Sequence, residues 1–172
     1  MGKEITGRQP FEIARLGIGY IPDDRRIFAD LTVEENLRIV RQVTRRDGRW
    51  TLERVYRLFP LLTELRAKHG SGLSGGEQKM LAIGRALMGN PSLLILDEPS
   101  EGLSPLTVKT LTEAIAQIQK EGVTLLVADQ NVKFARRVAG RGYIMEKGHI
   151  RYSGRLEELW ANEPVVKRYL AV

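Results

Sequence analysis

The stretch LLILDEP, from Leu93 to Pro99, decides the fold class of this 172-residue chain. Its unbroken run of four apolar residues is typical of a parallel β-strand that is buried on both faces. A helix is predicted next, with Ser104 before it, Pro105 in its first turn and Gly122 at its end. A second buried strand is predicted directly afterwards, over 123–128. This alternation of strands and helices indicates a doubly wound α/β sheet.

Two acidic residues, Asp97 and Glu98, directly follow the first of these strands. Proteins with parallel sheets bind their ligands at the carboxyl ends of the strands, where these side chains would lie. One carboxylate could hold Mg²⁺ through water, and the next could orient a water molecule for attack on a phosphoryl group. The alternative is that both acids only cap the following turn.

The string LSGGEQ, from Leu73 to Gln78, predicts the start of another helix. Ser74 can cap that helix while the side chain of Glu77 reaches back to it. The two glycines between them leave backbone N–H groups uncovered at the positive end of the helix dipole, which indicates an anion site. The alternative is a glycine-rich helix start without a ligand. The helix is predicted to end at Gly89 and to bury one apolar face, formed by Met80, Ile83, Gly84, Leu87 and Met88.

Upstream, the sequence predicts a strand over 17–21 that runs into a polar loop at Pro22. Thr32 and Glu35 have the spacing of a capping box and predict that a helix begins there. Residues 47–72 read as short helices in a helical insertion. Downstream, the pattern predicts a short helix and two hairpin strands, over residues 134–138, 143–145 and 149–152.

The composition limits the classes of partner. The net charge of +6 and the pI near 9.8 could indicate a nucleic-acid partner. We expect none, because the basic residues mostly alternate with acidic ones along helices and few aromatic residues lie between them. There is no cysteine, which excludes disulfides and cysteine-bound zinc and favours a cytoplasmic location. No apolar stretch approaches the roughly 20 residues that a membrane-spanning helix needs.

Together, LSGGEQ and LLILDEP resemble two motifs of the ABC ATPase family, the signature motif and the Walker B strand. The resemblance implies a P-loop NTPase-like fold with a mainly parallel sheet and a helical subdomain. It implies ATP and Mg²⁺ as cofactors. It also implies that the signature motif contacts the γ-phosphate of an ATP molecule held by the opposite subunit, through the residues Ser74, Gly75, Gly76, Glu77 and Gln78.

The same resemblance assigns further roles. Asp97 would serve Mg²⁺, and Glu98 would be the catalytic base. The family's D-loop, which touches the partner subunit, would be formed by Ser100, Glu101, Gly102, Leu103 and Ser104. The predicted organisation is one partial ATP-binding domain over 1–172. Its parts would be a helical subdomain with the signature motif, a Walker B core and C-terminal helices, at about residues 30–90, 91–152 and 153–172.

Four longer stretches are similar to the branched-chain amino-acid importers and their urea and amide relatives. These are GIGYIPDDRRIFADLTVEENL, SEGLSP, VADQN and RGYIMEKGHI. This narrower resemblance implies a homologous ATP-binding subunit and membrane permease subunits as partners, and a place on the inner face of the cell membrane. It does not decide between branched-chain amino acids, urea and amides as the transported solute.

The sequence departs from the family pattern at several points. It contains no G-x-x-x-x-G-K-[ST] string, so we expect an N-terminally truncated member that lacks Walker A and is inactive alone. Asp23 stands where the family has the Q-loop glutamine and could still meet Mg²⁺ through water. Gln130 stands in place of the switch histidine and is, with Glu98, a catalytic candidate. Ser104 replaces the usual D-loop aspartate.

These departures leave three hypotheses open. The chain could be a motor subunit that donates its signature motif across a dimer. It could be a non-catalytic module that docks on a permease or a full-length partner. It could also be an inactive remnant, with open sheet edges and exposed apolar surface that favour aggregation.

Overall fold

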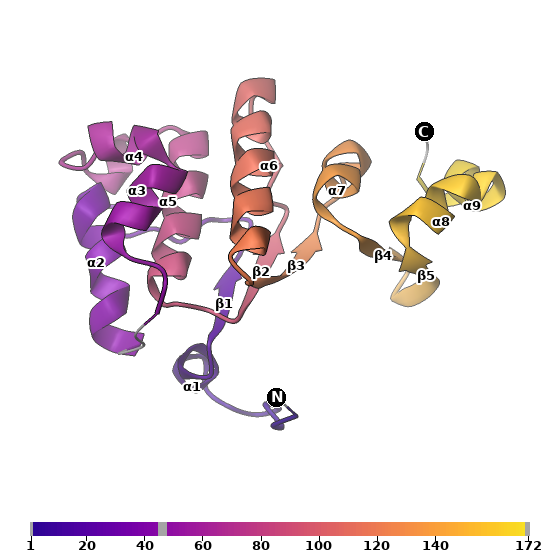
Figure 1. Cartoon of the computed structure of the whole chain (residues 1–172), viewed down its shortest axis with the longest axis horizontal. Coiled ribbons are helices and arrows are strands. Elements are labelled where there is room, and N and C mark those ends of the chain that lie inside the picture. The colour runs from indigo at the N-terminus through magenta and orange to yellow at the C-terminus, as the bar shows by residue number, and fades with distance from the viewer. Residues whose placement is uncertain (1, 45–47, 171–172) are drawn as a thin grey trace. The chain divides into compact units, whose positions relative to one another are not determined.

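The computed structural model describes residues 2–44 and 48–170 of the chain. These form two compact units that meet in sequence at Ala128 and Asp129 (Figure 1). The first unit contains a parallel sheet and most of the helices. The second contains an antiparallel hairpin and three short helices.

The sheet of the first unit has three strands, β1 (Ile18–Ile21), β2 (Leu93–Asp97) and β3 (Thr124–Ala128). Their order is β1-β2-β3, and both pairings are parallel. A short helix, α1 (Pro10–Arg15), precedes β1. All three strands were expected from the sequence, and their parallel pairing confirms the α/β class. The strand β2 therefore has a neighbour on each side, which is the place that its apolar run predicts.

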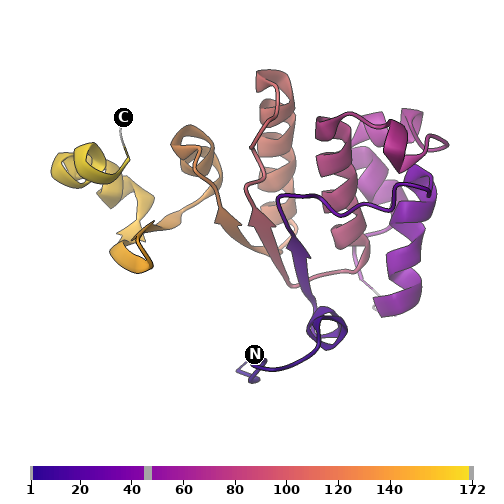
Figure 2. The same ribbon diagram turned by 180° about the vertical axis from the view of Figure 1, so that it is seen from behind.

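The strand β3 differs from its prediction, because it is not buried. Leu126 is 53% exposed, and Thr124 and Ala128 are exposed as well. Among the described residues β3 pairs with β2 alone. The helix α6 (Pro105–Lys120), whose buried residues include Leu111, lies on one side of the sheet, as Figures 1 and 2 show. An apolar run thus predicted the strand correctly but not its burial, because burial also depends on neighbours elsewhere in the sequence.

A group of helices forms the rest of the first unit. Its members are α2 (Val33–Thr44), α3 (Leu52–Leu58), α4 (Pro60–Glu64), the 3₁₀ turn Gly70–Gly72 and α5 (Gly75–Met88). This confirms the predicted helical insertion, although its first residue, Asp47, lies outside the described residues. The side chains of the group that are fully buried include Leu37, Val55, Leu62, Ile83 and Leu87. These residues come from all four α-helices, so the group has a hydrophobic core of its own.

The loop between β1 and α2 is held by one buried amide. Asn36, which is 0% exposed, accepts a 2.9 Å hydrogen bond from the backbone N–H of Phe28. Its Nδ2 donates to the carbonyl oxygens of Phe28, Leu31 and Thr32 at 2.9, 3.1 and 3.0 Å. The predicted capping box is also present, because Thr32 N donates to Glu35 at 2.8 Å and Glu35 N donates to Thr32 Oγ1 at 3.2 Å.

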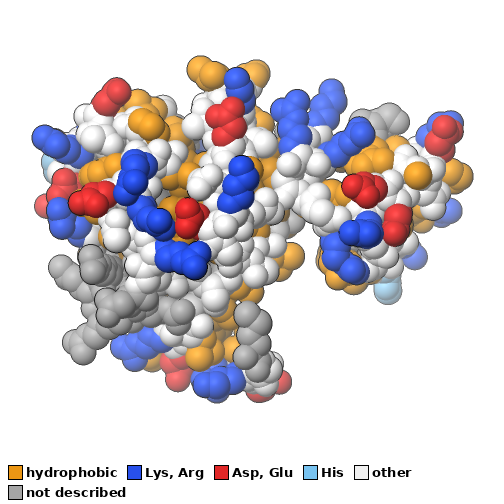
Figure 3. All heavy atoms as spheres, viewed as in Figure 1, with side chains coloured by type: hydrophobic (Ala, Val, Ile, Leu, Met, Phe, Trp, Pro, Cys, Tyr) orange, Lys and Arg blue, Asp and Glu red, His pale blue; other side chains and the backbone are white. Residues whose placement is uncertain are grey.

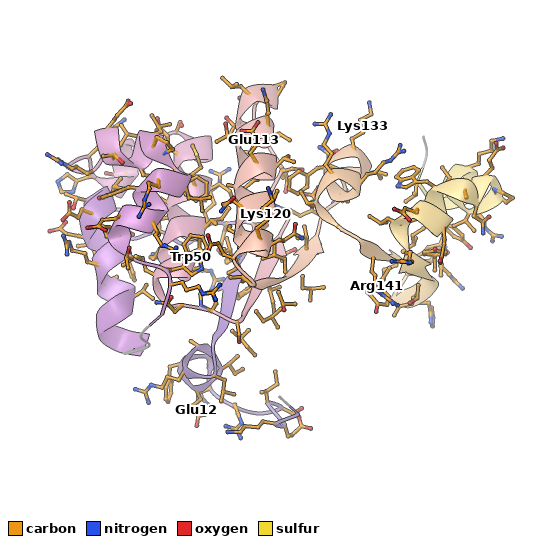
Figure 4. All side chains as sticks on the ribbon, viewed as in Figure 1. Glu12, Trp50, Glu113, Lys120, Lys133 and Arg141 are labelled. Carbon is orange, nitrogen blue, oxygen red and sulfur yellow. The ribbon has the colours of Figure 1, made fainter. Side chains whose placement is uncertain are left out.

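A second amide joins the helical group to the segment before β2. The side chain of Asn90 accepts a 2.7 Å hydrogen bond from the N–H of Trp50 and donates a 3.2 Å bond to the Trp50 carbonyl. Asn90 has a φ of 49°, in the left-handed region that asparagine tolerates better than most residues. Trp50, labelled in Figure 4, is only 6% exposed, so this tryptophan is a packing residue.

The second unit contains α7 (Val132–Val138), β4 (Arg141–Glu146), β5 (His149–Arg155), α8 (Leu156–Ala161) and α9 (Glu163–Tyr169). The predicted short helix and hairpin strands are confirmed. Between the strands, Lys147 and Gly148 have φ values of 49° and 78°, which two-residue hairpin turns commonly require. The guanidinium of Arg136 lies 4.8 Å from the ring centre of Trp160, a cation–π contact between α7 and α8.

Charged side chains of both signs are mixed over the surface that Figure 3 shows. Several form ion pairs, such as Arg38 with Glu34 at 2.7 Å and Arg54 with Glu121 at 3.2 Å. Among residues 2–44 and 48–170, no helix is both long enough and apolar enough to span a membrane.

Candidate functional site

The amino end of α5 has the geometry that LSGGEQ predicts. Ser74 is the N-cap, and its N–H donates a 2.6 Å hydrogen bond to the carboxylate of Glu77. In return Glu77 N donates to Ser74 Oγ at 3.4 Å, so the predicted capping box is confirmed. The helix is 14 residues long, and the N–H groups of Gly75 and Gly76 lie in its first turn. Such a helix end is a favourable place for a negatively charged group.

Close neighbours face both glycines. A Cβ atom on Gly75 would lie 2.9 Å from Nη1 of Arg25, and one on Gly76 would lie 2.9 Å from Cγ2 of Thr107. Arg25 also donates a 3.3 Å hydrogen bond to the side chain of Gln78. The loop after β1 and the first turn of α6 therefore both pack against the LSGGEQ segment.

The two predicted carboxylates lie at the carboxyl end of β2. Asp97 accepts a 3.1 Å hydrogen bond from the hydroxyl of Tyr20, which belongs to the neighbouring strand β1. This hydrogen bond is the main reason that the pKa of Tyr20 is raised above its ordinary value. Glu98 has a φ of 41°, and its N–H donates to the carbonyl of Ala128 at 2.8 Å. A left-handed backbone at a glutamate is strained, and such residues often cluster at functional sites.

Asp23 lies in the loop after β1, and its carboxylate accepts a 2.7 Å hydrogen bond from the N–H of Asp24. Its backbone carbonyl is 3.4 Å from Nζ of Lys79, on α5. The same Nζ is 3.3 Å from the backbone carbonyl of Glu98. The structure thus brings three predicted elements together around one buried cation: the Asp23 loop, the end of β2 and the LSGGEQ helix.

Sequence reasoning missed Tyr20 and Lys79. A signal for Lys79 existed, because it lies four residues before Ile83 and therefore on the same buried face of the helix. A cation at such a position needs a partner. Tyr20 gave no comparable signal, since the partner strand of β1 is 75 residues further along the chain.

The loop from Ser100 to Ser104 connects β2 to α6. Ser100 is 6% exposed, and Gly102 has a φ of 66°. Ser104 is the N-cap of α6 and accepts a 3.2 Å hydrogen bond from Thr107 N. Serine and aspartate are both favoured at this position, so serine fulfils the local structural task. Gln130 follows β3 and belongs to the second unit, whereas the other predicted site residues all belong to the first.

A cavity of about 320 Å³ lies beside β1 and α5 in the first unit. Its lining includes Tyr20, Arg25 and Arg85, but neither predicted carboxylate of β2 and none of the LSGGEQ residues. Burial lowers the pKa of Arg85, whose guanidinium lies 4.8 Å from the ring centre of Phe28. The cavity therefore shares Tyr20 and Arg25 with the surroundings of the candidate site, but not the predicted carboxylates or the LSGGEQ residues.

Comparison with known proteins decides the family. Residues 1–101 match the family model described as ABC transporter. The chain belongs to the ABC transporter family. Within it, the chain is 42% identical over 170 residues to the high-affinity branched-chain amino acid transport ATP-binding protein BraG of Pseudomonas aeruginosa. That alignment covers 98% of this chain and 73% of BraG.

Other members of the ABC transporter family are similar over most of the chain. The probable branched-chain amino acid transport ATP-binding protein LivF of Archaeoglobus fulgidus is 32% identical over 173 residues, which cover 99% of this chain and 73% of LivF. The lipopolysaccharide export system ATP-binding protein LptB of Escherichia coli is 36% identical over 162 residues, which cover 91% of this chain and 66% of LptB.

Solved structures agree on the fold. An ATP-binding subunit of an ABC transporter superposes with a TM-score of 0.80 at 24% identity, over 99% of this chain and 71% of that one. An ATP-binding cassette in its ADP conformation gives a TM-score of 0.73 at 24% identity, over 96% and 72% of the two chains. The predicted ABC ATPase fold is confirmed. The roles of single residues in the signature motif, the Walker B strand and the D-loop stay predictions.

Proposed function

We propose that this chain is the ATP-binding subunit of an ABC importer and that it donates its signature motif to ATP held by a homologous subunit. Branched-chain amino acids are the favoured cargo, because BraG and LivF are both named for their transport. The proposed organisation has a helical subdomain at about 30–90, a Walker B core at 91–152 and C-terminal helices at 153–172. The helices α2 to α5 between residues 33 and 88 support the first of these parts.

The geometry at the amino end of α5 carries the proposal. Ser74 begins a long helix, and the two glycines after it present backbone N–H groups that no side chain of their own covers. A phosphate oxygen can therefore approach the backbone, where the helix dipole favours negative charge. The hydroxyl of Ser74 can donate a further hydrogen bond. Glu77 is committed to the capping box and Gln78 to Arg25, so both support the segment from within the chain.

The Walker B carboxylates fit the roles that the family implies. Bound Mg²⁺ would neutralise phosphate charge, and it usually combines one or two carboxylates with water and phosphate oxygens. Asp97 offers such an oxygen, and the Tyr20 hydroxyl fixes its orientation. Asp23 could contribute through water. No cluster of three or more metal-binding side chains occurs among the described residues.

Glu98 would act as the base that accepts a proton from the attacking water. Its backbone is held on both sides of its Cα, because its N–H donates to Ala128 and its carbonyl accepts from Lys79. Gln130 would hydrogen-bond the γ-phosphate without taking a proton. The loop from Ser100 to Ser104 would touch the partner subunit. A permease would hold the dimer at the inner face of the membrane.

Binding of Mg-ATP tests this function. It should be measured for the purified chain alone and after mixing with a homologous subunit that contains a phosphate loop. We expect none by the chain alone, because its sequence has no G-x-x-x-x-G-K-[ST] string. In the mixture, Ser74→Arg should weaken binding relative to the wild type, whereas Ser153→Arg on β5 adds the same charge elsewhere and should not.

The alternatives predict other outcomes. Turnover by the isolated chain that Glu98→Gln abolishes would overturn the proposal that this chain is inactive alone and depends on ATP held by another subunit. A stable complex with the partner subunit or a permease, without any change in nucleotide binding, would indicate a non-catalytic docking module. No complex and no binding in either sample would indicate an inactive remnant.

A further inference from the structure

Lys79 is a buried cation in the interior of α5. It is 2% exposed, although lysine is among the residues least often buried. Burial of an ammonium group is costly unless polar groups surround it. The carbonyl oxygens of Asp23 and Glu98, at 3.4 and 3.3 Å from Nζ, contribute to this polar environment. A buried charge with backbone partners on two other segments stabilises the relative position of those segments.

The two segments that Lys79 joins are those that carry the predicted carboxylates. One follows β1 and contains Asp23, and the other follows β2 and contains Glu98. Lys79 itself lies five residues after Ser74, little more than one turn into the helix that begins with the signature motif. A second contact reinforces the link, because Arg25 of the β1 loop donates back to Gln78 on α5.

The carbonyl of Glu98 makes this link more specific. Glu98 has a left-handed backbone, which a non-glycine residue keeps only where its surroundings hold it. Its carbonyl oxygen accepts from Lys79 Nζ and, at 3.3 Å, from the N–H of Glu101. The orientation of this peptide group fixes the point from which the Glu98 side chain extends.

We infer that Lys79 is a positioning residue, which couples the signature helix to the Asp23 loop and to the strained backbone of Glu98. The expected effect of Lys79 on catalysis rests on the proposed function. The connection that Lys79 makes between three segments of the chain does not depend on bound nucleotide. Lys79 touches neither phosphate nor water in this role and acts only through the segments that it holds.

Hydrogen exchange on the purified chain tests this connection. In Lys79→Met, the amides of Arg25, Glu98 and Glu101 should exchange about tenfold faster or more, the factor expected for loss of a hydrogen bond to a charged group. The amides of β2 and of the second half of α5 should keep their rates. Lys79→Arg should restore slow exchange in part, and Lys109→Met, at a side chain that is 72% exposed, should change nothing.

This pattern separates positioning from general stability. Removal of the Lys79 ammonium group ends the cost of burying a charge but leaves two carbonyl oxygens without this donor, so the two effects on the free energy of unfolding oppose each other. The thermal midpoint of Lys79→Met should therefore change little while exchange at the two loops rises. Unchanged exchange at the three amides would overturn the inference, and so would a uniform rise across the first unit.

Turnover in the mixture with a subunit that contains a phosphate loop tests the effect on catalysis. Lys79→Met should lower kcat about ten- to a hundredfold while KM for Mg-ATP stays within about twofold, because small errors of placement reduce the rate more than binding. An unchanged kcat would overturn the coupling to catalysis. No turnover by the wild-type mixture would instead count against the proposed function, and the exchange result would stand by itself.

Discussion

The hydroxyl of Tyr20 donates a 3.1 Å hydrogen bond to the carboxylate of Asp97 across two neighbouring parallel strands. This contact gives the first acid of the LLILDEP segment a fixed orientation. It also stabilises the protonated form of the tyrosine, because ionisation would place two negative charges side by side.

The contact predicts how Tyr20 titrates. Its pKa is raised, so its stabilising effect is present below the ordinary value of 10 and is lost as the pH rises through the higher folded value. Asp97→Asn should lower this pKa towards 10, because the charge of the acceptor disappears. An NMR titration of labelled tyrosine measures it, with Tyr20→Phe to assign the signal. The same pKa in both proteins would contradict the hydrogen bond.

Replacement of Gly84 by a larger residue is expected to disturb the packing of the helices. A Cβ atom there would lie 2.8 Å from Cγ1 of Val55 and 3.2 Å from Cδ2 of Leu37. Gly84→Ala should therefore destabilise the fold by about 1 to 3 kcal/mol, as overpacking does, although alanine is the better helix former. Urea unfolding measures the change. Gly140→Ala is the matched control, because nothing lies within 4 Å of the added atom.

Overpacking also predicts a specific interaction between two substitutions. If the clash with Val55 causes the loss, Gly84→Ala should cost less in a Val55→Ala background than in the wild type. Additive effects of the two substitutions would show that another contact is responsible.

Two substitutions of Asn90 should separate the loss of its hydrogen bonds to Trp50 from the strain of its left-handed backbone. Asn90→Gly keeps the left-handed backbone but removes both hydrogen bonds to Trp50, and should cost about 1 to 3 kcal/mol. Asn90→Ala removes the same bonds and adds backbone strain, so it should cost more. Urea unfolding compares the two variants, and the fluorescence of Trp50 should shift to the red as its backbone is released. Equal costs would mean that the left-handed φ of Asn90 carries no strain.

Glu35 is expected to contribute to the loss of stability of the fold at low pH. The hydrogen bond from the Thr32 hydroxyl is the main cause that lowers its pKa below the ordinary 4.5. The stabilisation is therefore present above pH 4.5 and is lost as the pH falls through the lower folded pKa. Glu35→Gln should reduce the thermal midpoint near neutral pH, and the difference from the wild type should shrink towards pH 3. A difference that does not change with pH would contradict this assignment.

The sequence predicted the elements of the candidate site well, because their signals are local. The capping box of Ser74 with Glu77 depends on four adjacent residues, and the β2 strand on one apolar run. Contacts between distant segments left no such signal. The hydrogen bond of Tyr20 with Asp97 and the reach of Lys79 to Asp23 both depend on strand order and helix placement. The exposure of β3 has the same origin, because a single run cannot show what lies on either side of it.

The side-chain amide of Asn36, in the first turn of α2, binds the backbone of Phe28 and so joins the two ends of the loop between them. Because one side chain binds both ends of this loop, an inserted or deleted residue between them would break several hydrogen bonds at once. Length variation among natural relatives should therefore be rare between these two positions.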